Sequence, residues 1–300
     1  MVPGLMREAV INLDSKQNSK LYDESGLYTT VIAAGQSSHQ YWKDLWRQRE
    51  LLYYLAWRDL IVRYKQTIIG ILWVLLRPLL TLIIFSLVFG KWAALSSSSK
   101  GFPYPLLVIA GLLPWNFFSS VVLDCSNSVL GNASLIGKVY FPRLIIPLST
   151  LMVSFVDFVV SCLLIIVVEM WTGTMPDIRI LSLPILTLWV GALGLGIGVW
   201  GAAINVRYRD IRHLIPFLLQ VGVFASPVGY STTIVPARWQ FLYSMNPMVG
   251  IIDSYRWAIL GKSFDAYFPG LTISILITII ILTTGIRYFR KSENKFVDYI

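Results

Sequence analysis

Charged residues are scarce in this sequence. Only 14% of its 300 residues are aspartate, glutamate, lysine or arginine, whereas soluble globular domains carry about 25%. Hydrophobic residues make up 56% of the chain, and the mean hydropathy is +0.65. This composition excludes an ordinary soluble domain and indicates that lipid surrounds most of the chain.

Cysteine and histidine are also rare. Cys125 and Cys162 form no CxxC pair, and His39 and His213 are too few and too far apart in the sequence to hold a metal. We therefore expect no metal site, and free cysteines that pack as small apolar residues. The sequence contains neither an HExxH nor a GxSxG motif.

A nucleotide-binding loop is missing as well. The nearest approach is RWAILGKS at 256–263, in which Arg256 stands where the motif requires glycine and no buried strand precedes it. We therefore expect neither ATPase activity nor a cofactor in this chain. The net charge of +9 lies on no soluble basic face, so nucleic-acid binding is not expected either.

Long apolar windows are what the sequence has in abundance. About 20 apolar helical residues cross a hydrocarbon core that is roughly 30 Å thick. The fifth window contains Pro216 and the turn-forming SPVG at 226–229. The windows predict an all-α integral membrane protein with six transmembrane helices within residues 68–290. They lie at 68–90, 105–123, 144–168, 181–204, 214–232 and 269–288.

Lysine and arginine predict the orientation, because basic residues are retained on the cytoplasmic side of a membrane. They are concentrated before the first window and in alternate connections after it, including NVRYRDIRH at 205–213. Both termini are therefore predicted to be cytoplasmic. Residues 1–41 are polar without a signal-peptide core, which predicts a flexible leader. Residues 291–300 are expected to form a cytoplasmic tail.

Two segments beside the windows have a mixed character. Residues 42–67 alternate aromatic and basic side chains, which predicts an amphipathic helix in the inner interface. This helix is either a plain anchor or also a docking surface for a cytoplasmic partner. Residues 124–138 are polar and weakly amphipathic. They predict either a short helix that transmits force from a soluble motor or a packed loop.

Two further patterns concern helix packing. Gly194 and Gly198 lie one turn apart in GALGLGIGVWGAAIN, and small residues at this spacing predict a close approach between helices. Residues 233–268 contain two short amphipathic stretches separated by Asn246 and Pro247. We expect these stretches to form re-entrant or surface helices.

Four blocks of the sequence carry a resemblance to a known family. They are RYKQTIIGILWVLLRPLLTLIIFSLVFG (63–90), LIGKVYFPRLIIPLSTLMVSFVDF (135–158), NVRYRDIRHLIPFLLQVGVFASPVGY (205–230) and NPMVGIIDSYRWAILG (246–261). Together they resemble the transmembrane subunit of ABC-type polysaccharide and polyol-phosphate exporters, in particular the permeases that export lipid-linked O-antigen. The resemblance covers roughly residues 42–290.

The resemblance implies a homodimeric permease in the bacterial inner membrane. It implies two copies of a separate nucleotide-binding subunit, which would hold ATP and Mg²⁺, and an undecaprenyl-diphosphate-linked glycan as substrate. Residues 124–138 would be the coupling segment, residues 42–67 would dock on the ATPase, and residues 233–268 would form a periplasmic gate. The residues expected at the ATPase contact are Leu130, Leu135, Ile136, Lys138, Arg58 and Asp59.

Arg77 and Asp157 are single charges within the first and third windows. An unpaired charge at the centre of a membrane helix costs at least about 2.5 to 3.5 kcal/mol, so Arg77 needs a partner. One candidate is Asp157, as a buried ion pair. The alternative is that Arg77 attracts the lipid diphosphate near the inner mouth, together with the arginines of the 205–213 turn, which are Arg207, Arg209 and Arg212.

Aromatic residues make up 14% of the chain. Sugar rings present C–H faces that stack on aromatic rings, although Trp and Tyr near span ends are also ordinary interfacial anchors. The candidates for a glycan path are Trp73, Phe85, Trp115, Phe117, Phe118, Phe217, Phe224 and Tyr230.

Two other functions are compatible with the sequence. The first is the export of teichoic acid or capsular polysaccharide by a related permease, which differs in the carrier. The second is a membrane-embedded glycolipid enzyme, which would need clustered acids. Asp124, Asp157 and Asp210 are instead scattered over separate segments.

Overall fold

The computed structural model describes residues 38–65, 70–92, 102–261 and 268–296. Most of the leader predicted at 1–41, the end of the tail and residues 262–267 of the gate segment lie outside these ranges. The chain divides into a unit of residues 1–41 and a unit of residues 42–300.

Within the described ranges every regular element is a helix, which confirms the all-α membrane fold. Five helical segments are long and apolar enough to cross a membrane. They coincide with five of the six predicted windows. Their bounds are Leu72–Gly90, Tyr104–Gly131, Ile145–Thr172, Ile178–Arg207 and Gly270–Lys295.

Several of these segments are composite. The first joins α3 (Leu72–Phe85) to a wider helical stretch at Ser86–Trp92. The third joins α6 (Ile145–Ser161) to α7 (Leu163–Thr172), and the fourth joins a short turn at Ile178–Ser182 to α8 (Leu183–Arg207). The last is α12 (Phe268–Ser292) with a final turn at Glu293–Lys295.

The fifth window is shorter in the structure than predicted. Its helix, α9 (Ile211–Ala225), has 15 residues, which span about 22 Å. The prediction of a span over 214–232 is therefore wrong at its outer end, where Ser226–Val228 bend away. Proline at 227 lacks the N–H that would continue the helix, as the SPVG sequence indicates.

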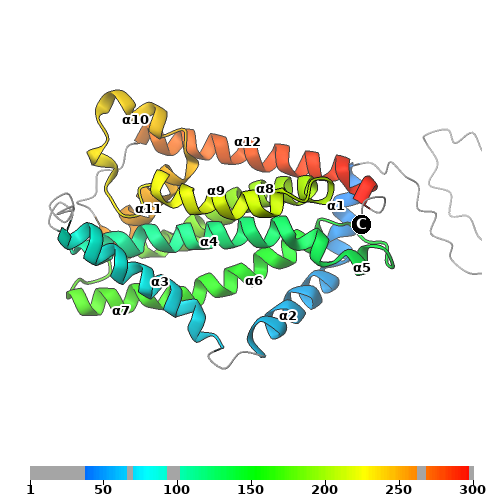
Figure 1. The fold of residues 1–300 in the computed structure, drawn as a ribbon, viewed down its shortest axis with the longest axis horizontal. Helices are drawn as coiled ribbons and strands as arrows, with labels where there is room; N and C mark the ends of the chain where they lie inside the picture. The colour runs from blue at the N-terminus through cyan, green and yellow to red at the C-terminus, as the bar shows by residue number, and fades with distance from the viewer. Residues whose placement is uncertain (1–37, 66–69, 93–101, 262–267, 297–300) are drawn as a thin grey trace, which may run out of the picture. The chain divides into compact units, whose positions relative to one another are not determined.

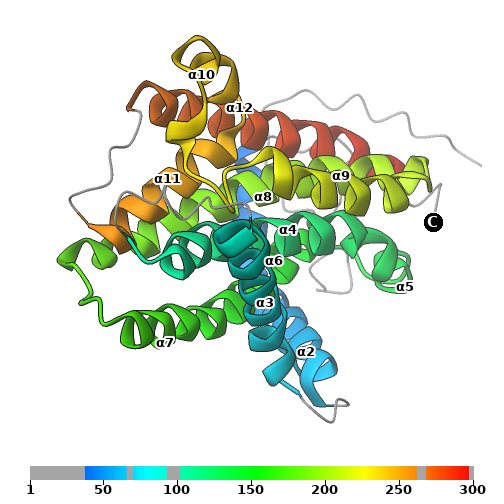
Figure 2. The same cartoon turned by 60° about the vertical axis from the view of Figure 1, so that its left-hand side comes forward.

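Helix α4 (Tyr104–Gly131) is the centre of the fold (Figures 1 and 2). Within its apolar window 78% of the residues are buried, against 17–39% in the other four long segments. It packs against α8, α6, α11 and α3. The close contact with α8 depends on small residues as predicted, because a Cβ on Gly198 would lie 2.5 Å from the Cβ of Cys125.

Helix α4 also corrects the prediction for residues 124–138. Its 28 residues extend about 42 Å, so it continues through Gly131 and beyond the thickness of a hydrocarbon core. Only Ala133–Ile136 form a separate short helix, α5. The segment is thus mostly the end of a long helix and not a loop.

The N-terminal helix predicted at 42–67 is two helices. They are α1 (Ser38–Arg47) and α2 (Arg49–Lys65), which meet at Gln48. Helix α2 packs along α6 through a face that includes the buried Leu55 and Ala56. Tyr53 and Trp57 of α2 are exposed, and so is Trp46 of α1.

In the described part of the connection between α9 and α12, two α-helices are separated at Asn246, as the sequence predicted. They are α10 (Ala237–Tyr243) and α11 (Pro247–Leu260), and the Asn246 side chain caps α11 by accepting from the N–H of Met248 at 3.0 Å. Helix α11 is buried on nearly all sides between α4, α8 and α12, so it is not a surface helix.

The segments expected to face the cytoplasm lie at one end of this unit (Figure 1). Helix α5, the turn between α8 and α9, and the C-terminal end of α12 are close together there, and α10 is at the opposite end. The alternation that the basic residues predict is therefore compatible with the fold.

Candidate functional site

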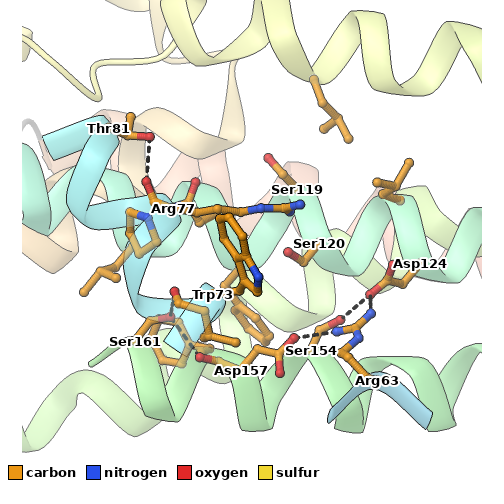
Figure 3. Close-up of a pocket in the computed structure, with 18 of the residues that line it drawn as sticks. Arg63, Trp73, Arg77, Thr81, Ser119, Ser120, Asp124, Ser154, Asp157 and Ser161 are labelled. Carbon is orange, nitrogen blue, oxygen red and sulfur yellow. Dashed lines mark hydrogen bonds and ion pairs between the residues drawn. The ribbon is translucent and has the colours of Figure 1, made fainter. Parts of the chain in front are cut away.

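A cavity of about 1010 Å³ lies between α2, α3, α4, α6 and α9 (Figure 3). Apolar residues from α3, α4, α6 and α9 contribute to its wall, with Pro216 and Leu219 coming from α9. Its polar lining is unusual for a chain with so little charge. These polar residues are Arg63, Tyr64, Arg77, Thr81, Asn116, Ser119, Ser120, Asp124, Ser154, Asp157 and Ser161.

One part of the cavity wall is an ion-pair cluster that joins three helices. Arg63 of α2 lies 2.8 Å from Asp124 of α4 and 2.5 Å from Asp157 of α6. The hydroxyl of Ser154 donates to Asp124 at 3.2 Å, and the hydroxyl of Tyr64 donates to Asp157. The two carboxylates therefore share one guanidinium (Figure 3).

The carboxylates of this cluster stabilise the protonated forms of Arg63 and Tyr64. Burial lowers the pKa of Arg63, but the charges and hydrogen bonds of Asp124 and Asp157 outweigh that effect and raise the pKa overall. Burial also raises the pKa of Tyr64, and its hydrogen bond to Asp157 adds to the shift. Arg63 and Tyr64 therefore stay protonated at neutral pH, which keeps both donors available.

Asp157 does not pair with Arg77, so that prediction is wrong. The partner of Asp157 is Arg63, which comes from a helix outside the apolar windows. Nor is Asp157 fully buried, since 18% of its side chain is exposed at the cavity. Arg63 of α2 is thus the counter-ion of Asp157, the acidic residue within the third apolar window.

Arg77 has a different environment. Its side chain reaches from α3 toward Ser119 and Ser120 of α4 (Figure 3). It is exposed, and no ion pair of Arg77 occurs in the part of the chain that the structure describes. The side-chain oxygen of Ser119 is buried and lacks a hydrogen-bond partner among the described residues. This part of the wall presents a free positive charge beside hydroxyl groups.

Pro78 helps to explain the local shape of α3. A proline inside a helix has no N–H for the carbonyl four residues earlier, which here is that of Val74. The hydroxyl of Ser161 lies 3.5 Å from this carbonyl oxygen. The hydroxyl of Thr81 in turn donates to the carbonyl of Arg77 at 2.9 Å. Polar side chains thus satisfy backbone groups next to the cavity.

The arginines of the 205–213 turn are not part of the cavity wall. Arg207, Arg209 and Arg212 are all exposed at the junction of α8 and α9. Arg207 lies over the ring of Tyr208, at 5.1 Å from the ring centroid. Of the four arginines predicted to attract a lipid diphosphate, only Arg77 lines the cavity.

Only some of the aromatic residues predicted to form a glycan path line the cavity. Trp73 and Phe117 line the cavity, and the prediction missed Tyr64 and Phe158, which line it too. The remaining candidates lie elsewhere. Phe85, Trp115 and Phe118 are buried in helix packing, Phe217 and Phe224 are exposed on α9, and Tyr230 shares a hydrogen bond with Tyr243 at 2.8 Å.

The residues expected to contact an ATPase lie near the end of α4. Arg58 of α2 pairs with Asp59 at 2.7 Å and donates to the side chain of Asn132 at 2.8 Å, which connects α2 to the start of α5. Lys138 is exposed, whereas Leu130 and Leu135 are partly buried. Ile136 is only 5% exposed, so it supports α5 from within and cannot be a direct contact.

Sequence reasoning missed the most deeply buried charge among the residues that the structure describes. Arg256 belongs to residues 233–268, which were assigned to a periplasmic gate, but its exposure is 0% and it lies within α11. Asp253, three residues earlier, is 4% exposed. The i, i+3 spacing of opposite charges in IIDSYRWAIL was the available signal.

Comparison with known proteins identifies the family. Residues 50–260 match the family model described as ABC-2 type transporter. The chain is 28% identical over 260 residues to the O-antigen export system permease protein RfbA of Myxococcus xanthus, which covers 86% of this chain and 98% of that protein.

Two further relatives are similar over most of their length. An O-antigen export system permease protein RfbA of Klebsiella pneumoniae is 28% identical over 254 residues, covering 84% of this chain and 95% of that protein. The polysialic acid transport protein KpsM of Escherichia coli is 22% identical over 242 residues, covering 79% and 91%. Because the family model matches well over half of the sequence, this chain belongs to the ABC-2 type transporter family.

Proposed function

We propose that this chain is the permease subunit of an ATP-driven exporter for a lipid-linked polysaccharide, with O-antigen as the leading substrate. The names of the relatives support this substrate class, since two of those described above are O-antigen export permeases. The observation that carries the proposal is the polar cavity, which lies among apolar helices and has an unpaired arginine in its wall.

The cavity offers groups for each part of such a substrate. Arg77 would bind the diphosphate of an undecaprenyl carrier, because a guanidinium matches phosphate oxygens in charge and geometry. Asn116, Ser119 and Ser120 would exchange hydrogen bonds with sugar hydroxyls. Trp73 is 49% exposed, so its ring is free to stack on a sugar face.

The energy source would be a separate subunit. We expect two ABC ATPase subunits, which hold ATP and Mg²⁺, on a homodimer of this chain in the bacterial inner membrane with both termini in the cytoplasm. Helix α5 and the exposed residues Ser134 and Lys138 would contact the ATPase. The bond between Arg58 and Asn132 would make α2 move together with that contact.

A second candidate is capsule export. KpsM of E. coli, named a polysialic acid transport protein, is a relative over 79% of this chain. The same cavity would then receive a glycan on a different carrier, and teichoic acid export falls in the same group. A membrane-embedded glycolipid enzyme is less well supported, because Asp124 and Asp157 are both paired with Arg63 and are not free to bind a metal-diphosphate.

Removal of the chain from cells that assemble a lipid-linked polysaccharide tests the proposal. The glycan should then accumulate on the inner face, out of reach of a glycosidase added to spheroplasts. Wild-type protein should restore digestion, whereas Arg77→Gln should not. Normal surface glycan in the deleted cells would contradict the proposal. Loss of capsule with normal O-antigen would favour the second candidate.

A further inference from the structure

Arg256 gathers four backbone carbonyls around one buried side chain. Its Nη1 donates to Tyr230 at 2.9 Å, and its Nη2 donates to Pro227 at 2.5 Å and to Val228 at 3.1 Å. Its Nε donates to Leu107 of α4 at 3.4 Å. Three of the four acceptors belong to residues 226–230, which we call the α9 turn because it directly follows α9.

The guanidinium satisfies carbonyls that the helix end leaves without partners. The last carbonyls of a helix and those of a following turn have no intrahelical donor, and a buried carbonyl without a donor is costly. Arginine is suited to this position because its planar fork carries five N–H donors. Burial lowers the pKa of Arg256 to about 10, which still leaves it charged at neutral pH.

Other side chains hold the same turn from different helices. The hydroxyl of Tyr104 of α4 donates to the carbonyl of Gly229 at 2.6 Å. The side chain of Asn246, ahead of α11, donates to the hydroxyl of Ser226 at 2.9 Å. Pro227, Val228 and Gly229 are buried. The α9 turn is therefore a fixed, enclosed element and not a surface loop.

The α9 turn lies where the cavity walls continue toward the end of the fold that carries α10. Thr81 of α3 and Leu113 of α4 line the cavity. Farther along the same helices, a Cβ on Gly229 would lie 2.7 Å from a ring carbon of Phe85, and a Cβ on Gly111 would lie 3.0 Å from the carbonyl oxygen of Val228. The turn thus fills the space between α3 and α4 just beyond the cavity.

We propose that Arg256 is a positioning residue that holds the α9 turn as the outer seal of the cavity. The assignment of this side of the cavity to the outer face of the membrane rests on the proposed function and its orientation. The closure of the cavity on this side is argued from the contacts of the α9 turn with α3 and α4. Lysine would not replace arginine, because a single ammonium cannot reach carbonyls on both sides of the planar fork.

Cysteine accessibility tests the seal. In a protein with Cys125 and Cys162 replaced by alanine, Ser120→Cys places a thiol on the cavity wall. A membrane-impermeant maleimide is added from the outside to spheroplasts, and the labelling rate is measured without any export assay. The labelling result can therefore be interpreted even if the proposed function is wrong. An unchanged labelling rate would contradict the seal without contradicting the proposed function.

Arg256→Lys should raise the outside labelling rate by at least about tenfold, because several hydrogen bonds from a charged donor are lost. Labelling of the same thiol from the inside should not change, which separates loss of the seal from general unfolding. The matched control is Arg287→Lys on the exposed surface of α12, which should label at the parental rate. Parental labelling of the Arg256→Lys protein would overturn the proposal.

A milder variant covers the case in which Arg256→Lys does not accumulate. Tyr104→Phe removes only the hydroxyl that donates to Gly229. Since one hydrogen bond to the turn is lost, outside labelling should rise by about threefold to tenfold. An unchanged rate in this variant would also overturn the proposal.

Discussion

A guanidinium nitrogen of Arg63 in α2 lies 2.5 Å from a carboxylate oxygen of Asp157 in α6. Five residues earlier on α2, Arg58 reaches Asn132 at the start of α5. Helix α2 is therefore attached at one point to the wall of the cavity and at another to the segment proposed to contact an ATPase. A movement of α5 would therefore be transmitted to the cavity wall through α2.

The ion-pair cluster should contribute to folding stability. Arg63→Ala and Asp157→Ala are each expected to lower the free energy of unfolding by about 1 to 3 kcal/mol, because Arg63→Ala leaves both carboxylates without their counter-ion and Asp157→Ala removes one of the two ion pairs of Arg63. A double-mutant cycle should then give a coupling of about 1 kcal/mol or more. Thermal unfolding of the purified protein in detergent measures these values. The same cycle with Arg77 and Asp157 is the control, and it should be additive. Coupling there, with none between Arg63 and Asp157, would contradict the observed pairing.

Arg77 should matter for transport and not for stability. Because no ion pair of Arg77 occurs among the described residues, Arg77→Gln is expected to unfold at the wild-type temperature. Export should fall about tenfold or more, since a charge-assisted contact with the diphosphate is lost. Arg287→Gln on the exposed surface of α12 is the matched control and should export normally. A stable Arg77→Gln protein with full export would exclude the diphosphate role.

The end of α4 and the α5 segment should touch the ATPase through exposed side chains only. Cysteines at Ser134 and Lys138 should crosslink to the partner subunit, because both positions are exposed. A cysteine at Ile136 should not crosslink, because this side chain is 5% exposed and points into the protein. Mass spectrometry of the crosslinked complex identifies the sites. If Ser134 and Lys138 stay open to a soluble maleimide in the assembled complex, the contact lies elsewhere.

Asp253 should make the stability of the protein depend on pH. It lies in α11, outside the long apolar segments, and burial raises its pKa from 3.8 to about 6, against the opposing effects of Arg256 and Thr232. The folded state therefore binds more protons than the unfolded state between these two values, and stability falls as the pH rises through this window. Asp253→Asn should remove this fall. The free energy of unfolding of the variant, relative to that of wild type, should therefore rise by at most about 3 kcal/mol between pH 4 and pH 7. Unfolding temperatures measured from pH 4 to pH 7.5 test this, and parallel curves for the two proteins would refute it.

The sequence predicted the long helices because lipid imposes a simple requirement on them. Each of the five long segments needs about 20 apolar residues, and no other local feature of the sequence is required. Helix α9 was predicted too long because the apolar residues continue beyond Pro227, whereas the helix ends at Ala225. Helix α11 has only 14 residues, which is too short for an apolar window of about 20 residues.

The polar contacts of the site could not be predicted in the same way. Asp157 was expected to pair with a charge inside the windows, whereas its partner Arg63 comes from α2 beside them. Similarly, the positive-inside rule counts Arg256 as an exposed residue of a connection, although its side chain is fully buried. Both contacts depend on how helices distant in the sequence pack together, and hydropathy carries no information about that.

ATP-driven movement of a lipid-linked glycan in reconstituted vesicles is the most direct test. The vesicles would contain this chain, its partner ATPase with the nucleotide sites facing outward, and an undecaprenyl-diphosphate-linked glycan in the outer leaflet. On addition of ATP and Mg²⁺, the glycan should become protected from an added glycosidase, and this should not occur with Arg77→Gln. ATP hydrolysis by the wild-type complex with no glycan becoming protected would contradict the proposed function.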